Sequence, residues 1–261
     1  MKIKLLKKAI NSILRKFGFT IVNVNRFEVQ DATPKTFFEK ANLLDGFYNF
    51  LKNQQYEPIT IYDIGANKGS WTAGCLEFFP DTTYYLFEPQ INLKKDIDTL
   101  FLNKKNIQLF SVGVGNANGE LLFTIRERDD SCTFILSESE AKQQGLKQIK
   151  VPIVQLDSFV VENKLMPPSI LKIDAEGFDI EVLQGAKKLM QNAEIIMIEV
   201  GVVNKIFKNS ALNVMKYLDE AGFRFFDITD LNRPFENKAL WLCEFVFIKK
   251  NGVLDKDYLN K

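Results

Sequence analysis

The 261-residue sequence contains no histidine, only three cysteines, and no apolar run of the roughly 20 residues that cross a bilayer. Without histidine, the side chain that most often serves as general base or metal ligand is missing. Any proton transfer must therefore use Asp, Glu, Lys, Tyr or Cys. The cysteines, Cys75, Cys132 and Cys243, are scattered and odd in number. This pattern predicts reduced thiols in a cytoplasmic protein, with neither a disulfide framework nor a cysteine metal site.

Charge is nearly balanced overall but unevenly distributed. The chain has 34 basic and 33 acidic residues, yet residues 1–26 hold seven basic residues and no acidic one. The remainder is therefore net acidic, which argues against a nucleic-acid partner for it.

Residues 1–30 are expected to form a basic amphipathic helix and a connector, ahead of a main domain over 31–261. Apolar side chains between residues 3 and 17 recur at helical spacing, with lysine and arginine mostly elsewhere. Such a helix could contact an anionic inner membrane face, or a partner, through residues 1–26. The alternative is a helix packed on the domain, or a dimer contact, with a solvated basic face.

The rest of the chain alternates between strand-like and helix-like patterns. Strands are expected at 59–64, 83–88, 107–114, 169–174, 194–200, 223–228 and 242–249, and helices at 34–53, 69–79, 91–102, 178–191 and 210–221. This order predicts an α/β, doubly wound, mostly parallel seven-stranded sheet, with the last two strands as an antiparallel edge hairpin. Residues 115–157 break the alternation with two strand-like segments and polar loops, as expected of an insertion that contacts substrate.

The turn after the first strand reads Asp63-Ile-Gly65-Ala66-Asn67-Lys-Gly69. Its spacing differs from the G-x-G-x-x-G of dinucleotide sites and is similar to the D/E-x-G-x-x-x-G turn of S-adenosylmethionine-dependent methyltransferases. Gly65 allows close backbone approach, and Asn67 tolerates a positive φ. The alternative is a tight strand-to-helix turn that binds no ligand.

The next two strand ends supply further candidate contacts to a nucleoside. Glu88 ends the second strand 25 positions after Asp63, where a carboxylate can accept hydrogen bonds from both ribose hydroxyls, and Pro89 stops the strand there. Glu88 could instead face solvent. Val112 and Gly113, at the third strand end, are positioned to flank the adenine.

Several separate motifs resemble the FkbM family of methyltransferases. They are "YDIGANKGSWT", "FEPQ", "VGNANGE", "VPIVQLDSF" and, above all, "ILKIDAEGFDIEVLQGAKKLM" followed by "EIIMIEVG". The resemblance covers about residues 59–250. It implies the class I methyltransferase sheet, S-adenosylmethionine as donor and O-methylation as the usual outcome, with acceptors among natural products, polysaccharides and glycolipids.

Carboxylates at the strand ends are the candidate bases. Asp174 and Glu176 follow the fourth strand, where open α/β sheets bind ligands, and Glu199 ends the fifth. An ordinary carboxylate is too weak a base for an alcohol, so one would need a pKa raised by burial or by a neighbour. Alternatively, Asp174 or Glu176 caps a helix or orients the donor, and Glu199 hydrogen-bonds a loop. The three could hold a divalent cation, but no spacing requires one, and no metal is expected.

The acceptor is expected to be a saccharide, glycolipid or related metabolite. The "DAEG" segment is not the N/D-P-P-Y turn of enzymes that methylate nucleobase or glutamine amines. Two alternatives stay open: a small-molecule methyltransferase for a secondary metabolite, and a donor-binding scaffold that has lost catalysis and docks through its N-terminal helix.

Overall fold

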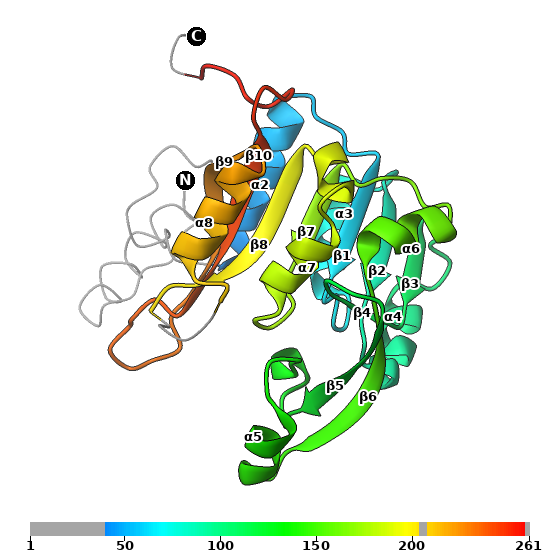
Figure 1. Ribbon diagram of the computed structural model, residues 1–261. Helices are drawn as coiled ribbons and strands as arrows, with labels where there is room; N and C mark the ends of the chain where they lie inside the picture. Colours follow the sequence, from blue (N-terminus) through cyan, green and yellow to red (C-terminus); the bar gives the residue numbers. More distant parts are fainter. Residues whose placement is uncertain (1–39, 204–207, 259–261) are drawn as a thin grey trace, which may run out of the picture. The chain divides into compact units, whose positions relative to one another are not determined.

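A seven-stranded sheet organises the residues that the computed structural model describes, which are 40–203 and 208–258 (Figure 1). Its strands are β1 (Thr60–Ile64), β2 (Thr83–Phe87), β3 (Ile107–Phe110), β7 (Ile170–Ile173), β8 (Ile195–Gly201), β9 (Phe223–Asn232) and β10 (Leu242–Lys249). The expected basic helix over 3–17, its connector, and the start of the helix expected over 34–53 lie outside the described residues.

The strand order is β3-β2-β1-β7-β8-β10-β9, and all pairs are parallel except those of β10, which runs antiparallel to both β8 and β9. The expected doubly wound sheet with an antiparallel edge hairpin is thus confirmed. The chain winds outward from β1 in both directions, so a crevice opens where β1 and β7 end side by side. Open α/β sheets bind ligands in this position.

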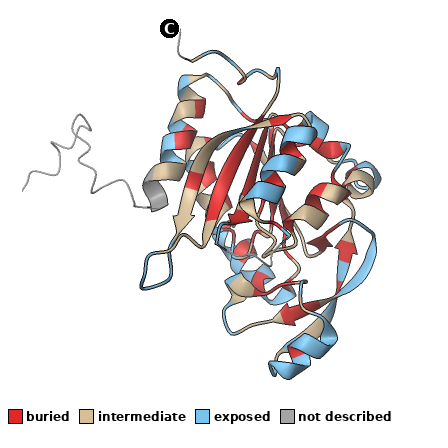
Figure 2. Cartoon of the chain, turned by 60° about the vertical axis from the view of Figure 1, so that its left-hand side comes forward, coloured by how far each residue is buried: buried red, intermediate tan, exposed pale blue. Residues whose placement is uncertain are grey.

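Helices cover both faces of the sheet. Alternate side chains of each strand point to opposite faces, so Ile61 packs with α2 (Lys40–Asn53), α3 (Ser70–Phe78) and α4 (Lys94–Leu100). Tyr62 packs with the other group, α6 (Leu156–Glu162), α7 (Asp179–Gly185) and α8 (Ala211–Glu220). The central strands are consequently buried on both sides, as Figure 2 shows.

The insertion forms a small second sheet of β4 (Gly113–Val114), β5 (Gly119–Ile125) and β6 (Lys147–Val154), in the order β4-β6-β5. Together with α5 (Glu138–Gln143) it projects from the main body as an arm (Figure 1). Phe123, Cys132 and Val151 form a core of its own. Among the described residues, the connections also contain the short 3-10 helices η4 (Ile91–Leu93), η5 (Asp129–Ser131) and η6 (Leu189–Asn192).

Two expected elements had wrong bounds, and one helix was not expected. The strand expected over 107–114 divides, because Gly113 and Val114 leave the main sheet to pair with β6. The helix expected over 178–191 ends at Gly185, where a Cβ would lie 1.9 Å from the carbonyl oxygen of Gly115, and continues separately as η6. Residues 156–162 form α6, which the sequence patterns did not indicate.

Candidate functional site

The turn after β1 depends on three residues with left-handed backbone. Gly65, Asn67 and Gly69 have φ values of 79°, 47° and 81°. A Cβ on Gly65 would lie only 1.8 Å from the carbonyl oxygen of Asp174. The ends of β1 and β7 therefore approach each other so closely that only glycine fits at this position. Gly69 precedes the first residue of α3.

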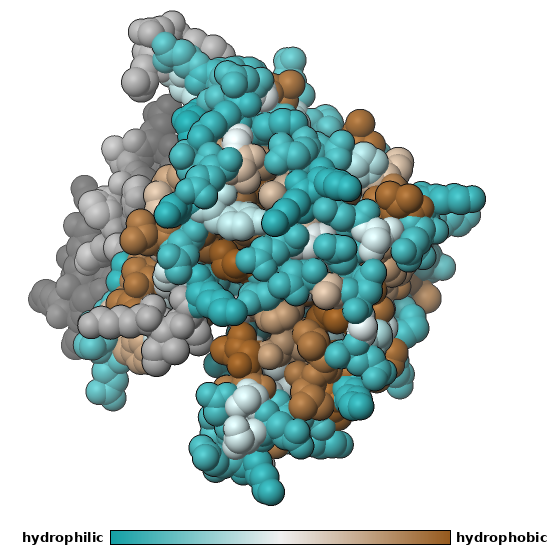
Figure 3. All heavy atoms as spheres, in the orientation of Figure 1, coloured by the Kyte–Doolittle hydropathy of each residue, from teal (hydrophilic) through white to brown (hydrophobic). Residues whose placement is uncertain are grey.

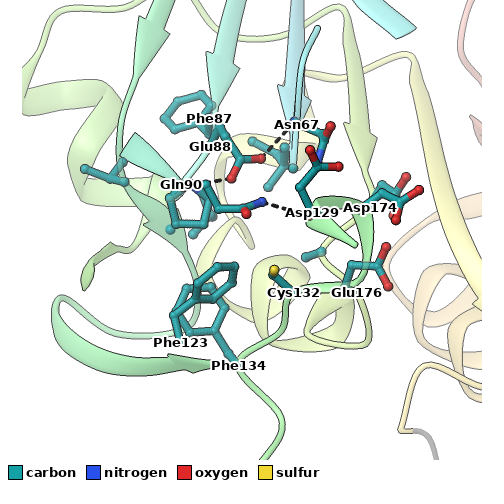
Figure 4. Close-up of a pocket in the computed structure, with 18 residues that line it drawn as sticks. Asn67, Phe87, Glu88, Gln90, Phe123, Asp129, Cys132, Phe134, Asp174 and Glu176 are labelled. Atoms are coloured by element: carbon teal, nitrogen blue, oxygen red, sulfur yellow. Dashed lines mark hydrogen bonds between the residues drawn. The ribbon is translucent and has the colours of Figure 1, made fainter. Parts of the chain in front are cut away.

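Glu88 fastens this turn to the end of β2. It is only 4% exposed; its Oε2 accepts a hydrogen bond from the main-chain N–H of Asn67 and its Oε1 one from that of Gln90, both at 2.8 Å (Figure 4). Burial raises the pKa of the Glu88 carboxyl, and these two hydrogen bonds oppose the rise.

An inner pocket opens at these strand ends. Glu88, Asn67 and Gln90 lie on one side, with Phe87 beside Glu88, and Phe134 lies across from Glu88 (Figure 4). Its remaining lining residues are Ile64, Gly65, Pro89, Val112, Gly113, Val114, Phe123, Asp129, Asp130, Cys132, Asp174, Ala175 and Glu176.

The insertion closes one side of the inner pocket. The Nε2 of Gln90 donates to the carbonyl oxygen of Asp129 at 2.9 Å, and the ammonium of Lys68 lies 2.5 Å from the Asp129 carboxylate. Two contacts therefore hold the loop after β5 against the segments that follow β1 and β2. Phe134 packs over Gly113, where a Cβ would lie 2.6 Å from its ring.

The turn after β7 is held by a buried carboxylate. Asp179 accepts hydrogen bonds from the main-chain N–H groups of Ala175 (2.9 Å) and Gly177 (3.1 Å) and from the amide of Asn209 (2.8 Å). The hydroxyl of Thr133 donates to the carbonyl oxygen of Glu176 at 2.7 Å. With φ of 49°, Glu176 itself has a left-handed backbone, which these bonds maintain.

This turn gathers three carboxylates at the rim. One oxygen from each of Asp174, Glu176 and Glu199 lies within 4.8 Å of the others. Oxygen ligands so arranged could hold a divalent cation, although carboxylates also gather where no ion binds. The side chains expected to perform catalysis are thus close together.

Lys172 is the buried cation beside this cluster. It is 3% exposed, and its ammonium lies 3.3 Å from Asp63 and 3.4 Å from Asp174. Burial alone would lower the pKa of Lys172, but the charges of Asp63, Asp174 and Glu244 together raise it. Lys172 therefore stays protonated and orients Asp174.

The carboxyl groups of Glu176 and Glu199 have raised pKa values. Burial, followed by the charges of Asp174, Asp179 and Asp130, raises the pKa of Glu176 to about 8. Burial and the same acidic turn raise that of Glu199 well above its ordinary value. A carboxylate with a pKa near neutrality is suited to proton transfer at physiological pH.

Two adjoining cavities, together called the outer hollow, share Ser131, Glu176, Glu199, Trp241 and Leu242, and Glu176 also lines the inner pocket. Both tryptophans of the chain, Trp71 and Trp241, line the outer hollow, and so does Glu199. Its other lining residues include Arg126, Ser131, Thr133, Ile135, Lys172, Asn209 and Asn232. Apolar side chains also appear on the surface where the arm meets the body (Figure 3), and Ile135 is 40% exposed.

Most of the residues expected to bind the donor line the inner pocket, but three do not. Asp63 is fully buried and accepts a hydrogen bond from the hydroxyl of Thr72 at 2.7 Å. It therefore links β1 to α3, on either side of the turn. Ala66 lines the outer hollow, and Gly69 lines neither cavity.

Several residues of the two cavities escaped the sequence analysis. For Lys172 there was a signal, a lysine inside an otherwise apolar strand. Gln90, Phe134 and Trp241 carried none, because their segments reach the site only through tertiary packing.

The fold and the site have the features expected of a methyltransferase: a seven-stranded sheet in this order, a pocket at the ends of β1 and β2, and three carboxylates after β7 and β8. The chain belongs to the FkbM methyltransferase family, since the model of the methyltransferase FkbM domain matches residues 63–225.

The comparisons also found a sequence relative and solved structures that the chain resembles. The hexuronic acid methyltransferase AglP of Haloferax volcanii is 24% identical over 189 residues, which cover 70% of each chain. The precorrin-6y C5,15-methyltransferase of Geobacter metallireducens is 10% identical, with a TM-score of 0.42 over 78% of this chain and 88% of that one. The 1,6-didemethyltoxoflavin-N1-methyltransferase of Burkholderia thailandensis, with bound S-adenosylhomocysteine, is 11% identical, with a TM-score of 0.45 over 80% and 78%.

Proposed function

We propose that the chain transfers a methyl group from S-adenosylmethionine to a hydroxyl group of a saccharide. The observation that carries this proposal is the junction of the two cavities. The inner pocket presents a buried carboxylate, Glu88, beside an apolar wall, and the adjoining outer hollow presents three carboxylates and two tryptophans.

The inner pocket fits the donor. Each oxygen of Glu88 has a lone pair beyond the one given to a main-chain N–H, so the carboxylate can also accept hydrogen bonds from ribose hydroxyls. Phe134 and Val112 offer an apolar wall suited to adenine, and Gly65 lines the same pocket at the strand end, where the methionine part would lie. When bound, the donor supplies a methyl group activated by its sulfonium.

Glu176 is assigned as the base. It takes the proton of the acceptor hydroxyl as the oxygen attacks the methyl group, a step that its raised pKa favours. Asp174, held by Lys172, orients the acceptor hydroxyl, and Glu199 accepts a hydrogen bond from a second one. Fixing the acceptor oxygen in line with the methyl group can supply on the order of 7–11 kcal/mol.

The outer hollow supports a saccharide as acceptor. Carboxylates accept hydrogen bonds from hydroxyl groups, and Trp71 and Trp241, which line the hollow, add apolar surface that suits a sugar ring. A relative at 24% identity, AglP, is named for a hexuronic acid substrate. A small metabolite with hydroxyl groups remains the alternative within the same chemistry.

Two measurements test the proposal. Calorimetric titration should detect binding of S-adenosylmethionine, and absence of binding would contradict any enzymatic role. Labelled methyl transfer to a panel of oligosaccharides should then give a product. Glu176→Gln should reduce turnover about 10²–10⁴-fold while donor affinity stays within about twofold. A Glu176→Gln variant with full turnover would refute the assignment of the base.

The location of the protein stays a prediction. No helix within the described residues is long and apolar enough to cross a membrane. We propose that the enzyme is cytoplasmic, with residues 1–26 as the segment for any membrane or partner contact. Flotation with anionic liposomes, with and without these residues, tests that contact; equal flotation of both forms would contradict it.

A further inference from the structure

We propose that Arg126 binds a carboxylate group of the acceptor, so that the preferred acceptor is an acidic sugar such as a uronic acid. This inference rests on the proposed transfer to a saccharide. It adds a subsite for a negative charge at one end of the outer hollow.

Arg126 lies at the junction of the arm and the main body. It directly follows β5, is partly buried, and lines the outer hollow together with Glu199 and Trp241. Its main-chain N–H donates to the Sγ of Cys132 at 3.3 Å, which fixes the start of the loop. The arm therefore fixes the main chain from which this side chain lines the hollow.

The guanidinium of Arg126 has no ionic partner among the described residues, whereas its neighbours do. Arg128 pairs with Asp130 at 2.8 Å and Lys68 with Asp129, but no carboxylate within 40–203 or 208–258 reaches the 4.0 Å of an ion pair with Arg126. A guanidinium carries five N–H donors in a planar fork that matches the two oxygens of a carboxylate. A partly buried guanidinium without an ionic partner can therefore bind an anionic ligand.

The rest of the hollow fits the other parts of such a ligand. Glu176 and Glu199 lie in the same hollow and favour hydroxyl groups, so its lining combines a cationic group with an acidic cluster. Asn209, only 1% exposed, lines it as well, and its Oδ1 accepts no hydrogen bond from any described residue. The hydroxyls of an acidic sugar suit Glu176 and Glu199 and its carboxylate suits Arg126, whereas a neutral sugar leaves Arg126 without an ionic partner.

Carboxyl reduction of oligosaccharides provides the matched test, because it converts each uronic acid into the neutral sugar of the same linkage. Labelled methyl transfer is measured on uronic-acid oligosaccharides, on their reduced forms, and on sugar phosphates as a second source of anionic oxygen. We expect wild-type kcat/KM to favour the uronic acids over the reduced forms about 10- to 100-fold, the factor for a bidentate charged hydrogen bond.

Two variants and a control assign this preference to Arg126. Arg126→Gln should bring the ratio close to about 1, and Arg126→Lys should keep part of it, because lysine keeps the charge but loses the fork. Lys150→Gln removes an exposed positive charge from the same small sheet and should leave the ratio unchanged. Thermal unfolding and S-adenosylhomocysteine affinity check that each variant is folded.

The outcomes separate the inference from the proposed function. Equal transfer to acidic and neutral sugars, or a preference that survives Arg126→Gln, would overturn the inference and leave saccharide methylation intact. A preference for sugar phosphates over uronic acids would overturn the carboxylate as the group that Arg126 binds. Transfer to no saccharide at all would overturn the acceptor class itself, and the inference with it.

Discussion

Glu176 should make methyl transfer depend on pH in a way that two neighbouring side chains can tune. Burial and nearby negative charges raise the pKa of its carboxyl to about 8. Only the ionised form can take a proton, so kcat/KM should rise with pH up to that value and level off above it. With a pKa of about 8, the ionised fraction increases roughly 30-fold between about pH 6.5 and 9.

The loop after β5 offers two opposite perturbations. Asp130 contributes to the raised pKa of Glu176, and Arg128, which pairs with Asp130, interacts favourably with the Glu176 charge. Asp130→Asn should therefore shift the pH–rate midpoint downward, and Arg128→Gln should shift it upward. Both groups are exposed to solvent, so each shift should be about half a pH unit, and smaller at high salt.

The assay is labelled methyl transfer at subsaturating acceptor across the pH range, in buffers of constant ionic strength. A rate independent of pH between about pH 6 and 9 would refute the assignment of Glu176 as the base. Midpoint shifts of the same sign in both variants would show that the two charges do not act through Glu176.

A stability measurement tests the same pKa without any acceptor. A carboxyl whose pKa is about 8 in the folded protein and near its ordinary 4.5 when unfolded binds its proton more tightly in the native state. The free energy of unfolding should therefore fall as pH rises from about 4.5 to 8. Glu176→Gln should remove part of this fall and stabilise the protein at about pH 9 by about 2 kcal/mol, below the full shift because the side chain is partly exposed. Urea unfolding at several pH values measures it, and an unchanged slope would count against the raised pKa.

Three further predictions concern the donor pocket, the turn after β1 and whether methyl transfer needs a metal ion. Glu88→Ala should weaken S-adenosylmethionine binding about 10- to 100-fold in calorimetry, since a buried acceptor of charged hydrogen bonds is lost; unchanged affinity would contradict its role. Gly65→Ala should destabilise the protein by more than about 2 kcal/mol, whereas Gly74→Ala, with nothing within 4 Å of the added Cβ in α3, should stabilise it by up to about 1 kcal/mol. Thermal unfolding compares the two, and equal effects would contradict the close approach. Methyl transfer should continue in excess EDTA, because Lys172 already supplies a cation to the rim; loss of activity restored by Mg²⁺ would assign the three carboxylates to a metal.

Local patterns predicted most of the main sheet because each strand carries its own signal. The apolar runs of β1, β7 and β8 reflect burial on both faces, and the alternation of strands with helices dictates parallel pairing. The same patterns misjudged residues 107–114 and 178–191. There the outcome depended on a distant partner, β6 in the first case and the carbonyl oxygen of Gly115 in the second.

The sequence by itself determined the sheet, the glycine turn and the carboxylates at the ends of β7 and β8, because parallel strands bring their carboxyl ends to one edge whatever the details of packing. Only the tertiary structure decided which of these groups face the cavities. It buried Asp63 beside Lys172 and raised the pKa of Glu176 through the charges around it. It also placed Arg126 and Trp241, far apart in the chain, around one hollow. Desolvation and charge interactions depend on distances between segments, and a sequence pattern does not contain those distances.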